Sequence, residues 1–250
     1  TVPGAIEAAQ RAKGFNKGLF EWLRKAPWGN PAFAGMFLSL VMFGFLGGIS
    51  GVVMGTEQIN LIIHNTIYVP GHFHATVVAG TTLAFMAITY LLVPLIFRRE
   101  VMFKKIAQWQ PYVFGLGIAG ISLFMMGAGT LGVPRRHWDI TFADALSQFQ
   151  FSPAAFLMLA LNGLSAIMAA IGGAMYIVVV VCSVFLGRKI GDNEVVQLGP
   201  VSGAASAAAV ARYGNEGTLK IPGTVVLVGV FFVSFVLYYF VNWKYLAEVW

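Results

Sequence analysis

Charged residues are scarce in this chain: 16 Lys and Arg and 10 Asp and Glu make up 10% of its 250 residues. In soluble domains about one quarter of the residues are charged, so this deficit of charge excludes a soluble enzyme of this length. Hydrophobic residues account for 58% and the mean hydropathy is +0.77, which excludes an intrinsically disordered chain. The single cysteine, Cys182, excludes a disulfide framework and a cysteine-based metal site.

The start of the chain lacks a basic stretch that leads into a short apolar core, so we expect no signal peptide. The first residue is Thr1, and we expect the chain to be part of something longer or a processed product. The net charge of +6 does not indicate a nucleic-acid partner. The basic residues lie in short clusters between long apolar runs, which is typical of the loops of a polytopic membrane protein.

Five apolar runs are long enough to cross a membrane as helices, which requires about 20 residues each. They are residues 32–55, 69–97, 112–132, 153–186 and 223–243. Residues 1–25 predict a partial helix and a cytoplasmic segment, and residues 187–220 predict a cytoplasmic loop. Because only helices or closed barrels satisfy the backbone inside lipid, and these runs are too long for barrel strands, the predicted fold is all-α. It is a polytopic transmembrane helical bundle of five full spans with a partial helix at the N-terminus.

The Lys and Arg residues predict the orientation of this bundle. Thirteen of the 16 fall on one side, which the positive-inside rule makes cytoplasmic. These are Arg11, Lys13, Lys17, Arg24, Lys25, Arg98, Arg99, Lys104, Lys105, Arg188, Lys189, Arg212 and Lys220. Arg135 and Arg136 therefore lie outside, directly after a span. Adjacent guanidinium groups suit carboxylate or phosphate anions; lipid headgroups or a neighbouring Asp would also satisfy them.

Two of the four histidines, His72 and His74, lie inside an apolar run, where ionisable residues mark a functional site. On an α-helix, residues i and i+2 are about 200° apart, so these imidazoles cannot bind one metal ion together. They can serve two prosthetic groups on opposite flanks, which fits two hemes held by axial histidines, with Phe73 between them. The arginine pair lies on the same side of the membrane, where heme propionates need cations. The alternative is that each histidine bonds to a neighbouring helix.

Three sequence blocks resemble subunit I of the heme–copper oxygen reductases, the cytochrome c oxidase superfamily. They are His64-Asn-Thr-Ile-Tyr-Val-Pro-Gly-His-Phe-His74, the pair Trp28-Gly-Asn-Pro-Ala32 and Gly47-Gly-Ile-Ser-Gly51, and Val133-Pro-Arg-Arg-His-Trp-Asp139. The resemblance covers nearly the whole chain but only the C-terminal part of a family subunit. Asn65, Pro70-Gly71 and the terminal span resemble the B-type branch most.

The resemblance implies a role for each matching residue. His72 would be the proximal ligand of a high-spin heme where oxygen is reduced, and His74 an axial ligand of a low-spin heme. Phe73 would lie between the two hemes. The remaining residues would lie in the heme propionate region: Arg135, Arg136, Asp139 and His64. Asn65 replaces the aspartate that many members use for magnesium, which argues against a magnesium site. Glu57 and Glu7 have no assigned role.

The copper ligands and the second low-spin heme ligand lie on earlier helices in the family, and this chain lacks the histidines to supply them. We therefore expect a partner polypeptide with the N-terminal part of subunit I, so that this chain is the C-terminal part of a split, cleaved or incomplete subunit. A subunit II with a dinuclear copper centre or a quinol site is the other expected partner. The electron donor is left open between cytochrome c, a small copper or heme protein, and quinol.

The resemblance implies a terminal respiratory oxidase that reduces O₂ to water and pumps protons across a prokaryotic inner membrane. Three alternatives stay open. A nitric oxide reductase-like relative would have non-heme iron in place of copper. A non-catalytic membrane cytochrome would only carry electrons. A transporter with structural histidines would bind no heme.

Overall fold

The structure is a computed structural model that describes residues 2–136, 151–191 and 222–249. In chain order, its elements are α1 (Val2–Ala12), α2 (Glu21–Arg24), α3 (Pro31–Val41), the π-helix η1 (Met42–Gly48), α4 (Ile49–Gly55), α5 (Glu57–Ile63), α6 (Tyr68–Phe73), the π-helix η2 (His74–Thr82), α7 (Leu83–Ile96), α8 (Lys104–Thr130), α9 (Pro153–Leu186) and α11 (Pro222–Val249). These residues form no β-strand, only two isolated bridges. The all-helical prediction is confirmed.

Four helical stretches of the described chain are long and apolar enough to cross a membrane. They are Pro31–Gly55, Tyr68–Ile96, Lys104–Thr130 and Pro153–Leu186. Two of them are composite, because α3, η1 and α4 form one stretch and α6, η2 and α7 form another. Helix α11 has 28 residues, but its apolar part, Pro222–Leu237, is shorter than these four. The fifth span therefore stays a prediction.

Local sequence signals explain where the spanning helices begin. The Asn30 side chain accepts hydrogen bonds from the backbone N–H groups of Ala32 and Phe33 at 2.9 and 3.2 Å, and Pro31 occupies the first helical position of α3. Helix α8 differs from the predicted span 112–132, because it begins at Lys104. Hydropathy locates only the apolar part of a helix, and the first turns of α8 are too polar to be included in the predicted span.

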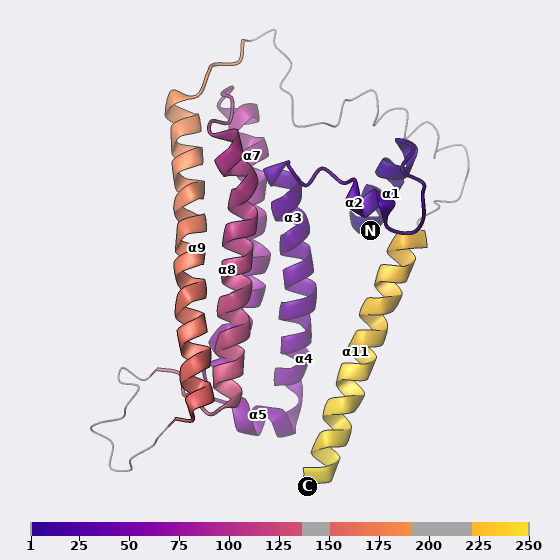
Figure 1. Cartoon of the computed structure of the whole chain (residues 1–250), viewed down its shortest axis with the longest axis vertical. Helices are drawn as coiled ribbons and strands as arrows, with labels where there is room; N and C mark the ends of the chain where they lie inside the picture. Colours follow the sequence, from indigo (N-terminus) through magenta and orange to yellow (C-terminus); the bar gives the residue numbers. More distant parts are fainter. Residues whose placement is uncertain (1, 137–150, 192–221, 250) are drawn as a thin grey trace.

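The elements meet at two opposite ends of the bundle (Figure 1). Helices α1 and α2, the turn between α7 and α8 and the end of α9 lie at one end, whereas α5, the start of α9 and the C-terminus lie at the other. At the first end, Arg188 Nη2 lies 2.7 Å from Glu100 Oε1, which joins the α7–α8 turn to the segment after α9. The basic segments before α3, between α7 and α8 and just after α9 thus share one end.

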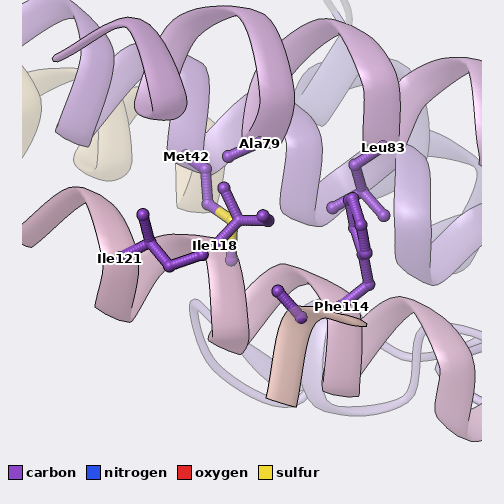
Figure 2. Packing of buried hydrophobic residues seen from close by; sticks show 7 residues of the cluster. Met42, Ala79, Leu83, Phe114, Ile118 and Ile121 are labelled. Carbon is purple, nitrogen blue, oxygen red and sulfur yellow. The ribbon is translucent and has the colours of Figure 1, made fainter. Parts of the chain in front are cut away.

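The centre of the bundle is a cluster of buried apolar side chains drawn from five elements (Figure 2). Its members are Met42 of η1, Ala79 of η2, Leu83 of α7, Phe114, Ile118 and Ile121 of α8, and Ala169 of α9. Small residues let the helix backbones approach, as is common in membranes. A Cβ on Gly117 of α8 would lie 2.5 Å from the backbone nitrogen of Ala169. Close packing therefore fixes α8 against α9.

Helix α11 is attached to the rest of the chain through a buried carboxylate. Glu7 of α1 is 0% exposed. Its carboxylate oxygens accept hydrogen bonds from the backbone N–H groups of Gly223 and Thr224 at 2.9 and 2.6 Å, at the N-terminus of α11. Arg11 Nε donates to the same carboxylate at 2.7 Å. Glu7 thus satisfies N–H groups that α11 cannot satisfy internally, and its negative charge suits the helix N-terminus.

Candidate functional site

His72 lies in the last turn of α6, half-buried against α4. Its Nδ1 is 2.8 Å from the hydroxyl of the buried Ser50. The Ser50 hydroxyl has one proton, and its oxygen also lies within hydrogen-bond distance of the carbonyls of Leu46 and Gly47. When that proton is donated to either carbonyl, Ser50 accepts the His72 bond and Nδ1 carries the imidazole proton. In that tautomer the Nε2 atom of His72 keeps its lone pair and can bind a metal.

His74 begins η2, and its Nδ1 also has a protein partner. Its Nδ1 lies 2.7 Å from the backbone carbonyl oxygen of Pro70, one turn earlier. A carbonyl can only accept, so Nδ1 of His74 is the donor, and in a neutral ring Nε2 then carries the lone pair. Metal-binding histidines commonly donate their second ring N–H in this way, which fixes the ring and raises its basicity. Each imidazole can thus present Nε2 to a metal.

Gly51 and Phe73 lie beside the His72 ring. Gly51 faces the His72 ring, and a Cβ at Gly51 would lie 3.1 Å from His72 Cε1. Phe73 is 53% exposed, and its ring centroid is 5.6 Å from that of His72. Each histidine has a separate hydrogen-bond partner, which suits two axial ligands rather than one shared ion. The donor set therefore fits two hemes, each held by one imidazole.

Arg135 lies in the loop that follows α8. Its Nη2 donates to Asn65 Oδ1 at 2.8 Å, and its backbone N–H donates to the Asn65 carbonyl at 2.8 Å. Its Nε is buried and has no hydrogen-bond partner among the described residues. Such orphaned donors require an explanation, and a ligand carboxylate would satisfy this one. Arg136 is exposed and has a positive φ of 67°.

The other predicted site residues are placed less closely together. His64 is exposed at the end of α5, next to Asn65. Glu57 lies in the first turn of α5. Asp139, like His137, lies outside the described residues. Within the described chain, no group of three or more His, Cys, Asp or Glu side chains could hold a metal ion.

Sequence reasoning missed the residues that orient the site. Ser50 lies 22 positions before His72, and Asn65 lies 70 positions before Arg135. In each pair the two residues belong to different segments of the fold, so no spacing within one helix indicates the pairing. The sequence signal for Ser50 is its place in the Gly-Ile-Ser-Gly motif inside the predicted span 32–55. The π-helical turns that flank this region also went unpredicted, although such turns are frequent at functional sites.

The sequence profile of the family described as Cytochrome C and Quinol oxidase polypeptide I matches residues 1–163, which is more than half of the chain. The chain belongs to this family. The match includes both span histidines and both arginines of the site, and the predicted relationship to oxidase subunit I is confirmed. The more specific assignment to the B-type branch stays a prediction.

Two curated relatives and one solved structure illustrate the match. Cytochrome c oxidase subunit 1 of Thermus thermophilus is 35% identical over 148 residues, which cover 58% of this chain and 26% of that protein. The probable quinol oxidase subunit 1 of Staphylococcus aureus is 27% identical over 182 residues, covering 70% of this chain and 26% of that protein. A heme-copper terminal oxidase dimer solved by cryo-electron microscopy matches with a TM-score of 0.63 and 28% identity, over 80% of this chain and 36% of that chain. The chain thus spans about a quarter of the length of these two curated relatives.

Proposed function

We propose that this chain forms the heme-binding part of the catalytic subunit of a terminal respiratory oxidase, which reduces O₂ to water and couples the reaction to proton pumping. One observation carries the proposal. Two imidazoles in one helical segment each have Nδ1 hydrogen-bonded to a protein oxygen, which leaves Nε2 to face a metal, within the part of the chain that matches the oxidase family. A bound heme iron would supply the electron transfer and the oxygen chemistry.

The chain's own residues would divide the work at this site. His72 would hold the iron of the high-spin heme and His74 that of the low-spin heme, with the half-exposed Phe73 ring between them. The Ser50 hydroxyl and the Pro70 carbonyl would keep each ring in the binding tautomer. These fixed acceptors make each imidazole a stronger electron donor, which is one way a protein sets a heme potential.

The charged residues of the outer loops would serve the propionate region. The orphaned Arg135 Nε and the exposed Arg136 supply cations for propionate carboxylates. His64 and Asp139 belong to the same proposed region on the basis of the family resemblance. A cation here would act on a bound heme more strongly than it would in water, if the surrounding dielectric constant is low.

The proposal requires partners in a prokaryotic inner membrane. The N-terminal part of subunit I would supply the copper ligands and the second axial histidine of the low-spin heme, in another polypeptide. Subunit II would deliver electrons from cytochrome c, a small copper protein or quinol. The named relatives include both a cytochrome c oxidase and a probable quinol oxidase, so both donor classes are represented among them. No magnesium ion is part of the proposal.

Replacing His72 and His74 singly by alanine in the assembled oxidase tests these roles. We expect His72→Ala to abolish the carbon monoxide-induced change in the reduced spectrum while the low-spin heme bands persist. We expect His74→Ala to remove the low-spin bands instead. Each variant is the matched control for the other, because both remove one imidazole from the same turn. Loss of both hemes in either variant, or of neither, would contradict the assignment.

A further inference from the structure

The loop before α6 and the loop after α8 are joined at the outer end of the bundle. The Arg135 N–H donates to the Asn65 carbonyl, and the Ile67 N–H donates to the Val133 carbonyl at 2.9 Å. Thr66 and Pro134 form an antiparallel bridge between these bonds. Asn65 has a φ of 63°, a left-handed conformation that asparagine adopts more readily than most residues. The segment before α6 therefore holds the Arg135 backbone in place.

The Asn65 side chain holds the guanidinium group as well. Its Oδ1 accepts from Arg135 Nη2 at 2.8 Å, so one residue fixes both the backbone and the side chain of Arg135. An amide oxygen is neutral, so Asn65 itself does not offset the positive charge of the guanidinium. The ion pairs Arg11–Glu7 and Arg188–Glu100 do not include Arg135. Its buried Nε keeps one donor for a further acceptor.

We propose that Asn65 is a positioning residue, which orients Arg135 toward a heme carboxylate without itself offsetting the arginine charge, and thereby raises the midpoint potential of that heme. This inference rests on the proposed function. A nearby cation favours the ferrous heme, which carries one positive charge fewer than the ferric heme. A carboxylate at position 65 would pair with Arg135 and cancel its charge. The choice of a neutral acceptor at this position therefore matters to the potential.

Spectroelectrochemical titration of the assembled oxidase tests the inference through Asn65→Asp and Asn65→Gly. Both replacements tolerate the left-handed backbone. Asn65→Asp retains the shape and adds a charge, and we expect the reduction constant of one heme to fall about tenfold, which is about 59 mV for one electron. Asn65→Gly removes the side-chain anchor but leaves the arginine charge. We expect a smaller fall of about threefold.

Gln58→Glu is the matched control, because it adds the same charge on α5 at the same end of the bundle, with no hydrogen bond to Arg135. We expect it to change neither potential by more than about twofold. Equal shifts in Asn65→Asp and Gln58→Glu would overturn the inference, and so would an unchanged potential in Asn65→Asp with both hemes present. If the oxidase with Asn65→Asp does not assemble, the test rests on Asn65→Gly, because an unchanged heme potential in that variant also overturns the inference. A wild-type preparation without heme would instead refute the proposed function.

Discussion

Helices α9 and α11 are both long and apolar, but they are held to the molecule in different ways. Helix α9 lies beside α8 along its length (Figure 1), with small residues at the contact. Helix α11 contacts α1 near its start and α4 farther along, and Phe231 packs edge-on against Phe45 of η1 at 5.0 Å. Close packing distributed along a helix thus positions α9, whereas a polar junction at one end has a large share in positioning α11.

The comparison predicts that replacing a glycine by leucine will lower stability much more in α8, at the contact with α9, than in α11. Gly117→Leu places a side chain where a Cβ alone would collide with the Ala169 backbone. We expect it to destabilise the protein by about 3 kcal/mol or more, because backbone cannot yield as a flexible side chain can. Gly229→Leu in α11 has no neighbouring atom within 4 Å of the new Cβ, and we expect almost no change. Thermal unfolding of the purified membrane protein measures both.

Similar unfolding temperatures for the two glycine variants would contradict the distinction between the helices. A large loss in Gly229→Leu would show that α11 is packed against a surface that the isolated chain does not reveal. A small decrease in the unfolding temperature of Gly117→Leu would show that α8 and α9 can move apart with little loss of stability.

The polar junction of α11 can be broken at Glu7. We expect Glu7→Ala to weaken the docking of α11 by about 1–2 kcal/mol, because two N–H groups at the start of α11 lose their acceptor. Spin labels at two exposed positions, Val228 of α11 and Ile177 of α9, report the distance between the helices. Electron–electron double resonance in a Cys182→Ser background should show a broader distance distribution in Glu7→Ala.

Glu21→Ala is the control for the Glu7 variant. Glu21 also accepts a backbone N–H, from Lys17 at 2.6 Å, but this bond is local and exposed. We expect the distance distribution to stay narrow in Glu21→Ala. An equally narrow distribution in Glu7→Ala would mean that apolar packing alone positions α11.

The sequence predicted helices better than it predicted the contacts between them. Apolar runs reveal spans because lipid imposes a minimum length, and Pro31 or Pro153 marks where a helix starts. The opposite directions of His72 and His74 could likewise be predicted from their i, i+2 spacing, because helical geometry is local. The hydrogen-bond partner of His72 could not be predicted, since tertiary packing brings Ser50 there. The same holds for Glu7, which meets Gly223 across 216 positions.

The smallest expected effect is the pH dependence of α11 docking. Burial raises the pKa of the Glu7 carboxyl, but the hydrogen bonds from Thr224, Arg11 and Gly223 outweigh burial, so the pKa lies below its ordinary value of 4.5. A group with a lowered pKa stabilises the folded arrangement fully above its ordinary pKa, and this stabilisation is lost as the pH falls through the native pKa. Between neutral pH and about pH 5, the distance distribution between the Val228 and Ile177 labels should therefore stay constant.

Below pH 4.5, we expect that distribution to broaden in the wild type, as protonation of Glu7 weakens its hold on the N-terminus of α11. Glu7→Gln provides the matched control, because its amide cannot titrate and its distribution should be independent of pH over the same interval. Broadening in the wild type that begins well above pH 4.5, or that occurs equally in Glu7→Gln, would assign the transition to another group. The polar junction would then hold α11 by packing and neutral hydrogen bonds, as the bundle holds α9, and the contrast between the two helices would narrow.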